Sequence, residues 1–135
     1  MKAKTIAWIE DDYKTIGALT RLLQDAGHKI VTYGSWQEVK KKIEDVLAAD
    51  AIILDIILPP IEEGPYTGVR LLRQLRQEHK YSGPVIVCTG VRNPEVHAEL
   101  ENMLGATGIL RKPVRPSELF DKVIDALMKQ EEKSK

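Results

Sequence analysis

Short apolar runs alternate with longer amphipathic segments along the whole chain. The short runs are Thr5–Ile9, Lys29–Tyr33, Ala51–Leu54, Pro84–Cys88 and Gly108–Leu110. The first, third and fourth of these are almost continuously apolar and rich in Ile and Val, which is typical of strands buried on both faces of a parallel sheet. The runs therefore predict five strands that form one sheet.

The segments between the runs carry apolar residues at helical spacing. Three such faces are Ile16/Leu19/Leu22/Leu23/Ala26, Val69/Leu72/Leu75 and Leu119/Val123/Ile124/Leu127. Gly27 stands where a helix ends, and Ser35 with Glu38 forms a possible capping box at the start of the second helix. This alternation predicts an α/β fold, a doubly wound five-stranded parallel sheet with helices on both faces.

Two segments depart from the alternation. Residues 59–67 contain three prolines, a glycine and two acids, which indicates a loop. The charged residues from Gln130 onward are expected to fray. We therefore expect one domain over residues 1–130, followed by a charged tail at 131–135.

Composition narrows the class of protein. The 135 residues include 20 basic and 20 acidic side chains, so the net charge of zero argues against a broad nucleic-acid or membrane surface. The single cysteine, Cys88, excludes an internal disulfide. The longest apolar stretch is interrupted by Asp55 and falls short of the roughly 20 residues that a membrane span needs. We expect a cytoplasmic protein with no membrane contact and no direct nucleic-acid binding.

Polar residues gather where the expected strands end, at the edge of a parallel sheet where ligands bind. They are Glu10, Asp11 and Asp12 after the first strand, Asp55 after the third, Thr89 and Gly90 after the fourth, and Arg111, Lys112 and Pro113 after the fifth. Three clustered carboxylates repel one another unless a cation compensates them. Mg²⁺ suits oxygen ligands and retains positions for phosphate oxygens. Such acids can also simply cap the next helix or face solvent.

The chain resembles the receiver domains of two-component response regulators over roughly Lys4 to Lys129. The resemblance is carried by the stretches IAWIEDD, AIILDIILP, VIVCTG, LGATGIL and ILRKPV, in this order. It implies a flavodoxin-like fold with strand order 2-1-3-4-5. It also implies that Asp55 takes a phosphoryl group from a phosphohistidine, on a sensor histidine kinase or a histidine phosphotransfer protein, and that the domain then signals by conformational change.

The same resemblance assigns the site residues. Asp55 is the phosphoacceptor, Asp11 binds Mg²⁺ directly, Glu10 binds it through water, and the backbone carbonyl of Ile57 completes the protein ligands. Thr89, Gly90 and Lys112 serve the phosphoryl group, and the Lys112–Pro113 bond is cis, while Asp12 is expected to cap the first helix. No turnover of an external substrate is implied. The output is a downstream protein partner or an output domain outside this chain.

Three positions depart from the usual receiver pattern. Ile109 replaces an aromatic residue that usually couples to the threonine, so activation through backbone movement is expected. The loop after the third strand is longer than usual by roughly four residues, and its acids Glu62 and Glu63 could shield the site or contact a partner. Ile57 and Val91 are apolar residues bordering the path of the hydrolytic water, which predicts slow autodephosphorylation.

Three other functions are alternatives to this one. A degenerate receiver that binds a protein without phosphorylation is the main alternative. A phosphohydrolase would need a second acid at position 57, and a nucleotide- or flavin-binding domain would need a glycine-rich loop after the first strand. The remaining residues are expected to be structural: Trp8 and Cys88 in the core, Trp36 partly exposed at a possible interface, and His28, His79 and His97 as bystanders.

Overall fold

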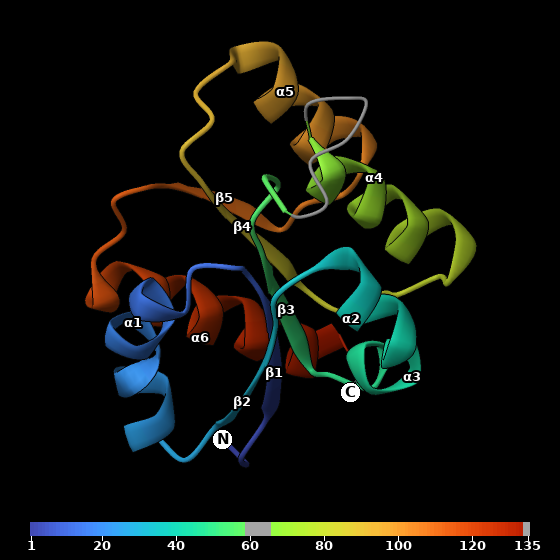
Figure 1. Ribbon diagram of the computed structural model, residues 1–135. Helices are drawn as coiled ribbons and strands as arrows, with labels where there is room; N and C mark the ends of the chain where they lie inside the picture. The colour runs from blue at the N-terminus through green and yellow to red at the C-terminus, as the bar shows by residue number, and fades with distance from the viewer. Residues whose placement is uncertain (59–65, 134–135) are drawn as a thin grey trace.

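The computed structural model describes residues 1–58 and 66–133, with the side chains of all of these except 13–16 (Figure 1). The elements are β1 (Thr5–Ile9), α1 (Tyr13–Asp25), β2 (Lys29–Tyr33), α2 (Trp36–Lys41), α3 (Ile43–Leu47), β3 (Ala51–Leu54), α4 (Thr67–Arg73), the π-helical η1 (Gln74–Glu78), β4 (Val85–Thr89), α5 (Pro94–Ala98), the π-helical η2 (Glu99–Met103), β5 (Gly108–Arg111) and α6 (Pro116–Lys133). The five strands form one parallel sheet in the order β2-β1-β3-β4-β5. The predicted fold class and strand order are confirmed.

Strand boundaries follow the apolar runs closely. The first three strands have the predicted limits, whereas β4 begins one residue later than predicted and ends on Thr89. The reason is that Pro84 has no N–H to donate to a ladder. Its carbonyl still accepts a bond of 2.9 Å from the N–H of Ile52. Because of this shift, Thr89 is the last residue of β4 and lies at the carboxyl edge of the sheet, where ligands bind in such folds.

Two apolar layers cover the sheet. Ile6 and Trp8 of β1 point to the layer that contains α1 and α6, while Ala7 and Ile9 point to the layer with α2, α3, α4 and the two π-helical segments. Figure 1 shows α1 and α6 together on one side of the sheet. Alternate residues of one strand serve opposite layers because side chains alternate across a strand. Trp8 and Cys88 are buried, as predicted.

The sequence-based expectations for the helix ends are confirmed at Gly27 and Ser35 and are wrong at two other positions. Gly27 follows α1 with a φ of 94°, and the Ser35 side chain accepts the N–H of Glu38 at the start of α2. Thr67, expected in the loop, is instead the first residue of α4. Helix α6 continues to Lys133, so residues 130–133, expected as a fraying tail, are helical. An ion pair of 3.1 Å between Lys4 and Glu131 holds this last turn to the start of the chain.

The expectation that Trp36 is partly exposed at a possible interface is wrong, because this residue is buried, with 7% of its surface exposed. The ring lies beneath two cations: the ammonium of Lys40 is 5.1 Å and the guanidinium of Arg70 is 5.2 Å from its centroid. Long basic side chains cover aromatic surface while keeping their charges in water. Arg70 belongs to the neighbouring helix α4, so the sequence around Trp36 does not reveal this contact.

Within residues 1–58 and 66–133, no helix combines the length and apolar character that a bilayer crossing requires. Glu62 and Glu63, expected to shield the site or contact a partner, lie outside the described residues.

Candidate functional site

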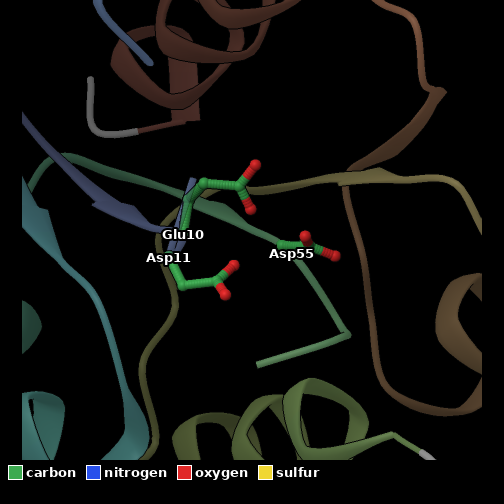
Figure 2. Close-up of side chains that lie close together, drawn as sticks. All are labelled: Glu10, Asp11 and Asp55. Carbon is green, nitrogen blue, oxygen red and sulfur yellow. The ribbon is translucent and has the colours of Figure 1, made fainter. Parts of the chain in front are cut away.

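Three carboxylates come together where β1 and β3 end. Strands β1 and β3 are parallel neighbours with Ile9 opposite Leu54, so the residues that follow them meet at one edge of the sheet. The N–H of Asp55 donates to the Ile9 carbonyl at 3.0 Å and fixes this approach. Glu10, Asp11 and Asp55 each offer a carboxylate oxygen, and these oxygens lie within 4.8 Å of one another (Figure 2).

Burial makes Glu10 the unusual member of this group. Glu10 is 1% exposed and Asp55 is 6% exposed, whereas Asp11 faces solvent. Desolvation, followed by the neighbouring Asp55, raises the pKa of Glu10 to about 8, against the lowering effect of Lys112. Its Oε2 is buried without a hydrogen-bond partner among the described residues. A buried oxygen of this kind is costly unless something outside the chain contacts it.

Lys112 joins the group from the far edge of the sheet. Its N–H donates to the Thr89 carbonyl at 2.9 Å, which continues the β4–β5 pairing by one residue. Its ammonium lies 2.9 Å from Asp55 Oδ2 and 2.5 Å from Glu10 Oε1. Burial lowers the pKa of Lys112, but the hydrogen bonds and charges of the two carboxylates outweigh that effect and raise it. The Lys112–Pro113 bond is cis, as predicted.

Thr89 is the last residue of β4, and Gly90 follows it at the same edge of the sheet. Thr89 is fully buried, and its Oγ1 accepts a bond of 3.1 Å from the N–H of Val91. A side-chain carbon added at Gly90 would meet nothing within 4 Å among the described atoms. The space beside this glycine is therefore open. Its use by a phosphoryl group remains a prediction.

The backbone after Asp55 is held from two directions. The Ile57 N–H donates to Asp55 Oδ1 at 3.0 Å, and the Ile56 carbonyl accepts the N–H of Gly68 at 2.8 Å. A side-chain carbon on Gly68 would lie 2.5 Å from the Asp55 carbonyl oxygen and 2.3 Å from the Ile56 Cα. Only glycine permits this approach of α4. The sequence analysis missed Gly68, although a glycine at a helix start was a visible signal.

The other predicted positions divide into structural and peripheral groups. Burial raises the pKa of the Cys88 thiol to about 12, so this cysteine is unreactive at neutral pH. His28 is buried and accepts the N–H of Lys4 at 3.0 Å, which gives it a structural role. His79 is exposed. His97, expected to be a bystander, lies 2.6 Å from the Val91 carbonyl oxygen. The capping role expected for Asp12 remains a prediction.

The oxygen-rich set fits a hard divalent cation. Carboxylate oxygens from Glu10, Asp11 and Asp55 converge, and Asp11 is exposed to solvent that could supply the water ligands Mg²⁺ retains. The buried Glu10 Oε2 also has no hydrogen-bond partner among the described residues. Two independent features, convergence and an unpaired buried oxygen, therefore agree with a metal site.

Comparison with known proteins decides the family. Residues 6–124 match the family described as response regulator receiver domain. The chain belongs to this family. A receiver domain is a signalling domain rather than an enzyme acting on external substrates, and such domains pair with histidine kinases. No curated protein matches the chain.

Solved receiver structures share the fold over almost their whole length. The CheY-like receiver domain protein from Methanospirillum hungatei JF-1 has 26% identity and a TM-score of 0.83, with 98% of this chain and 99% of that chain covered. Chemotaxis protein CheY4 of Vibrio cholerae has 25% identity and a TM-score of 0.77, with 93% and 99% covered. The receiver domain of a LuxO-type repressor from Vibrio parahaemolyticus, at 20% identity and a TM-score of 0.84, covers 98% and 96% and supports the fold alone.

Proposed function

We propose that this receiver domain accepts a phosphoryl group on Asp55 from a phosphohistidine donor and signals by conformational change. The donor would be a sensor histidine kinase or a histidine phosphotransfer protein. The observation that carries the proposal is the pairing of a nearly buried Asp55 with the Lys112 ammonium at 2.9 Å, beside two further carboxylates. An acceptor carboxylate needs such positive charge near the incoming phosphoryl oxygens.

Glu10, Asp11 and Asp55, together with the Ile57 carbonyl, are the residues that would hold Mg²⁺. When bound, Mg²⁺ would neutralise charge on the phosphoryl oxygens and help to orient them. The fit rests on the converging oxygens and on the buried Glu10 Oε2 that has no partner within the described chain.

The chain's own residues account for the rest of the chemistry. An Asp55 oxygen attacks phosphorus in line, the phosphorus–nitrogen bond breaks, and the electron pair leaves with the histidine nitrogen. Lys112, already bonded to Asp55 and Glu10, transfers a hydrogen bond to a phosphoryl oxygen. The Thr89 hydroxyl donates to another phosphoryl oxygen. The product is an acyl phosphate, which water later cleaves to restore Asp55 and release phosphate.

Labelling by a small phosphodonor tests this proposal without knowledge of the kinase. The protein is incubated with acetyl phosphate and Mg²⁺, and the phosphorylated fraction is measured by intact mass. We expect an added phosphoryl group in the natural chain and in Asp121→Asn, an exposed carboxylate of α6, but none in Asp55→Asn. Labelling that persists in Asp55→Asn would overturn the assignment. Absence of labelling in every protein would favour the degenerate receiver instead.

A panel of phosphorylated histidine kinases then tests the donor class. Transfer from at least one phosphohistidine protein, dependent on Asp55, is the expected result. A chain that labels with acetyl phosphate but accepts from no phosphohistidine protein would contradict the proposed donor.

A further inference from the structure

The peptide units on both sides of Val91 are tied to different parts of the molecule. Its N–H donates to the Thr89 hydroxyl oxygen at 3.1 Å. Its carbonyl oxygen lies 2.6 Å from His97 Nε2, which therefore carries the proton. Hydrogen bonds thus run without interruption from the proposed phosphoryl-binding hydroxyl to helix α5.

Helix α5 is also attached to the core through Val96, whose half-buried side chain packs against it. It has five residues, and none of them is buried. Its first turn is capped locally, since the Asn93 side chain accepts the N–H of Glu95 at 2.9 Å. That cap orders the helix start but does not connect it to the sheet. The His97 bond does connect them, because Val91 packs its half-buried side chain against the core.

At position 109 the neighbouring strand β5 carries an apolar side chain, whereas Arg111 lies opposite Thr89. Ile109 of β5 pairs with Val87, and its aliphatic side chain can neither donate nor accept a hydrogen bond. Among the hydrogen bonds described for residues 89–91, the His97 bond is the one that reaches α5 through a side chain.

We propose that His97 is a positioning residue that passes a movement of Thr89 to α5 through the Val91 backbone. This inference rests on the proposed function, because Thr89 moves only when a phosphoryl group draws its hydroxyl. The Val91 N–H follows the hydroxyl oxygen that it contacts. The Thr89 and His97 hydrogen bonds hold the two peptide units of Val91, so a shift of its N–H displaces its carbonyl too, and His97 moves with that carbonyl. The first turn of α5 then shifts relative to the sheet.

Beryllofluoride provides a stable mimic of the phosphoryl group for the test. Amide signals of the ¹⁵N-labelled protein are compared before and after addition of Mg²⁺ and beryllofluoride. The Ile57 amide, bonded to Asp55 Oδ1, reports whether the adduct forms. The amides of Glu95 and Ala98 report whether α5 responds.

Two conservative variants separate hydrogen bonding from structural support. The substitution His97→Gln keeps a donor nitrogen at the same number of bonds from the backbone, whereas His97→Asn is one bond too short to reach Val91. We expect His97→Asn to reduce the α5 shift changes roughly fivefold, the effect of losing one hydrogen bond, and His97→Gln to restore them. His79→Asn, at an exposed histidine, is the matched control.

The outcomes distinguish this inference from the function beneath it. An Ile57 response in all variants with an α5 response reduced only in His97→Asn would support the inference. An Ile57 response with equal α5 responses in all variants would overturn the inference and leave the phosphoacceptor site intact. Absence of the Ile57 response in the natural chain would count against the phosphoacceptor site itself, and the role of His97 would fall with it.

Discussion

Polar side chains are paired differently at the amino and the carboxyl ends of the strands. At the amino ends of the strands, polar side chains find backbone partners. The Asp50 carboxylate accepts the N–H of Thr5 at 2.8 Å, and the Tyr81 hydroxyl donates to the Ala49 carbonyl at 2.9 Å. At the carboxyl ends, three carboxylates lie close together, and the buried Glu10 Oε2 has no hydrogen-bond partner within residues 1–58 and 66–133.

Arg76 is another polar side chain that finds backbone partners at the amino end. Its guanidinium donates to the carbonyls of Tyr81 and Gly83, both at 2.7 Å, and to that of Gly105 at 2.8 Å. These carbonyls belong to the connections that precede β4 and β5. The amino end therefore stabilises the fold, while at the carboxyl end the buried Glu10 Oε2 has no hydrogen-bond partner among the described residues.

The largest expected effect comes from replacing Lys112, whose ammonium contacts Glu10 and Asp55 at the carboxyl ends of the strands. Lys112→Met should lower the initial rate of labelling by acetyl phosphate by about 100-fold, because a charge-stabilising donor is lost from the transition state. The rate is measured at saturating Mg²⁺. Lys129→Met, at an exposed lysine paired with Asp125 at 3.1 Å, should label normally. Equal rates for the two variants would contradict the role of Lys112.

The opposite end should respond in stability and not in chemistry. Arg76→Met removes three charged hydrogen bonds and should lower the free energy of unfolding by about 3 kcal/mol. Urea unfolding measures this change, and the labelling rate of the folded protein should stay the same. Arg73→Met, which breaks an exposed pair with Glu99 at 2.8 Å, should cost less than about 1 kcal/mol. Similar losses in both variants would remove the contrast between the ends.

The pH dependence of stability tests the burial of Glu10. Its pKa rises from 4.5 to about 8 on folding, so the folded state keeps a proton that the unfolded chain releases. The contribution of Glu10 to the free energy of unfolding is therefore fully present below pH 4.5 and is lost as the pH rises toward 8. In EDTA the free energy of unfolding should fall by up to about 1.4 kcal/mol for each pH unit within this range.

Substitution separates this carboxyl group from the other acids. Glu10→Gln should flatten the dependence between pH 5 and 8, while Glu101→Gln, at an exposed glutamate, should keep it. Thermal or urea unfolding across the pH series measures both. An unchanged slope in Glu10→Gln would show that Glu10 is not the titrating group.

The carboxyl-end site was largely predictable because it depends on topology. Apolar runs predicted the strands, and parallel pairing brings strand ends to one edge, so Glu10, Asp11, Asp55, Thr89 and Lys112 were expected to meet. The bond from Lys112 to Glu10 was not foreseen, since side-chain reach decides which of two nearby carboxylates a lysine contacts.

Features that depend on contacts between distant elements escaped the sequence analysis. The need for glycine at position 68 appears only when α4 crosses the backbone after Asp55. Trp36 is buried because Arg70 of another helix covers it. His97 gained a role only when the Val91 carbonyl was found beside it. In each case a tertiary neighbour overrides the local pattern.

The smallest expected effect concerns the lifetime of the acyl phosphate. Ile57 is a large apolar residue, 40% exposed, beside the acceptor. It should hinder the hydrolytic water, so that phosphorylated protein decays over minutes or longer rather than seconds. Ile57→Asn would keep the backbone carbonyl but offer a hydrogen-bonding side chain to that water. The decay rate should rise roughly fivefold, which corresponds to about 1 kcal/mol of barrier.

Leu22 on α1 provides the matched control for this last comparison. It is 39% exposed, close to the value for Ile57, but lies on a helix rather than beside Asp55. Leu22→Asn introduces the same polar group and should leave the decay rate unchanged. Decay is followed by intact mass after the phosphodonor is removed. A natural chain that loses its phosphoryl group within seconds, or equal decay in the two variants, would show that the apolar rim at Ile57 does not control hydrolysis.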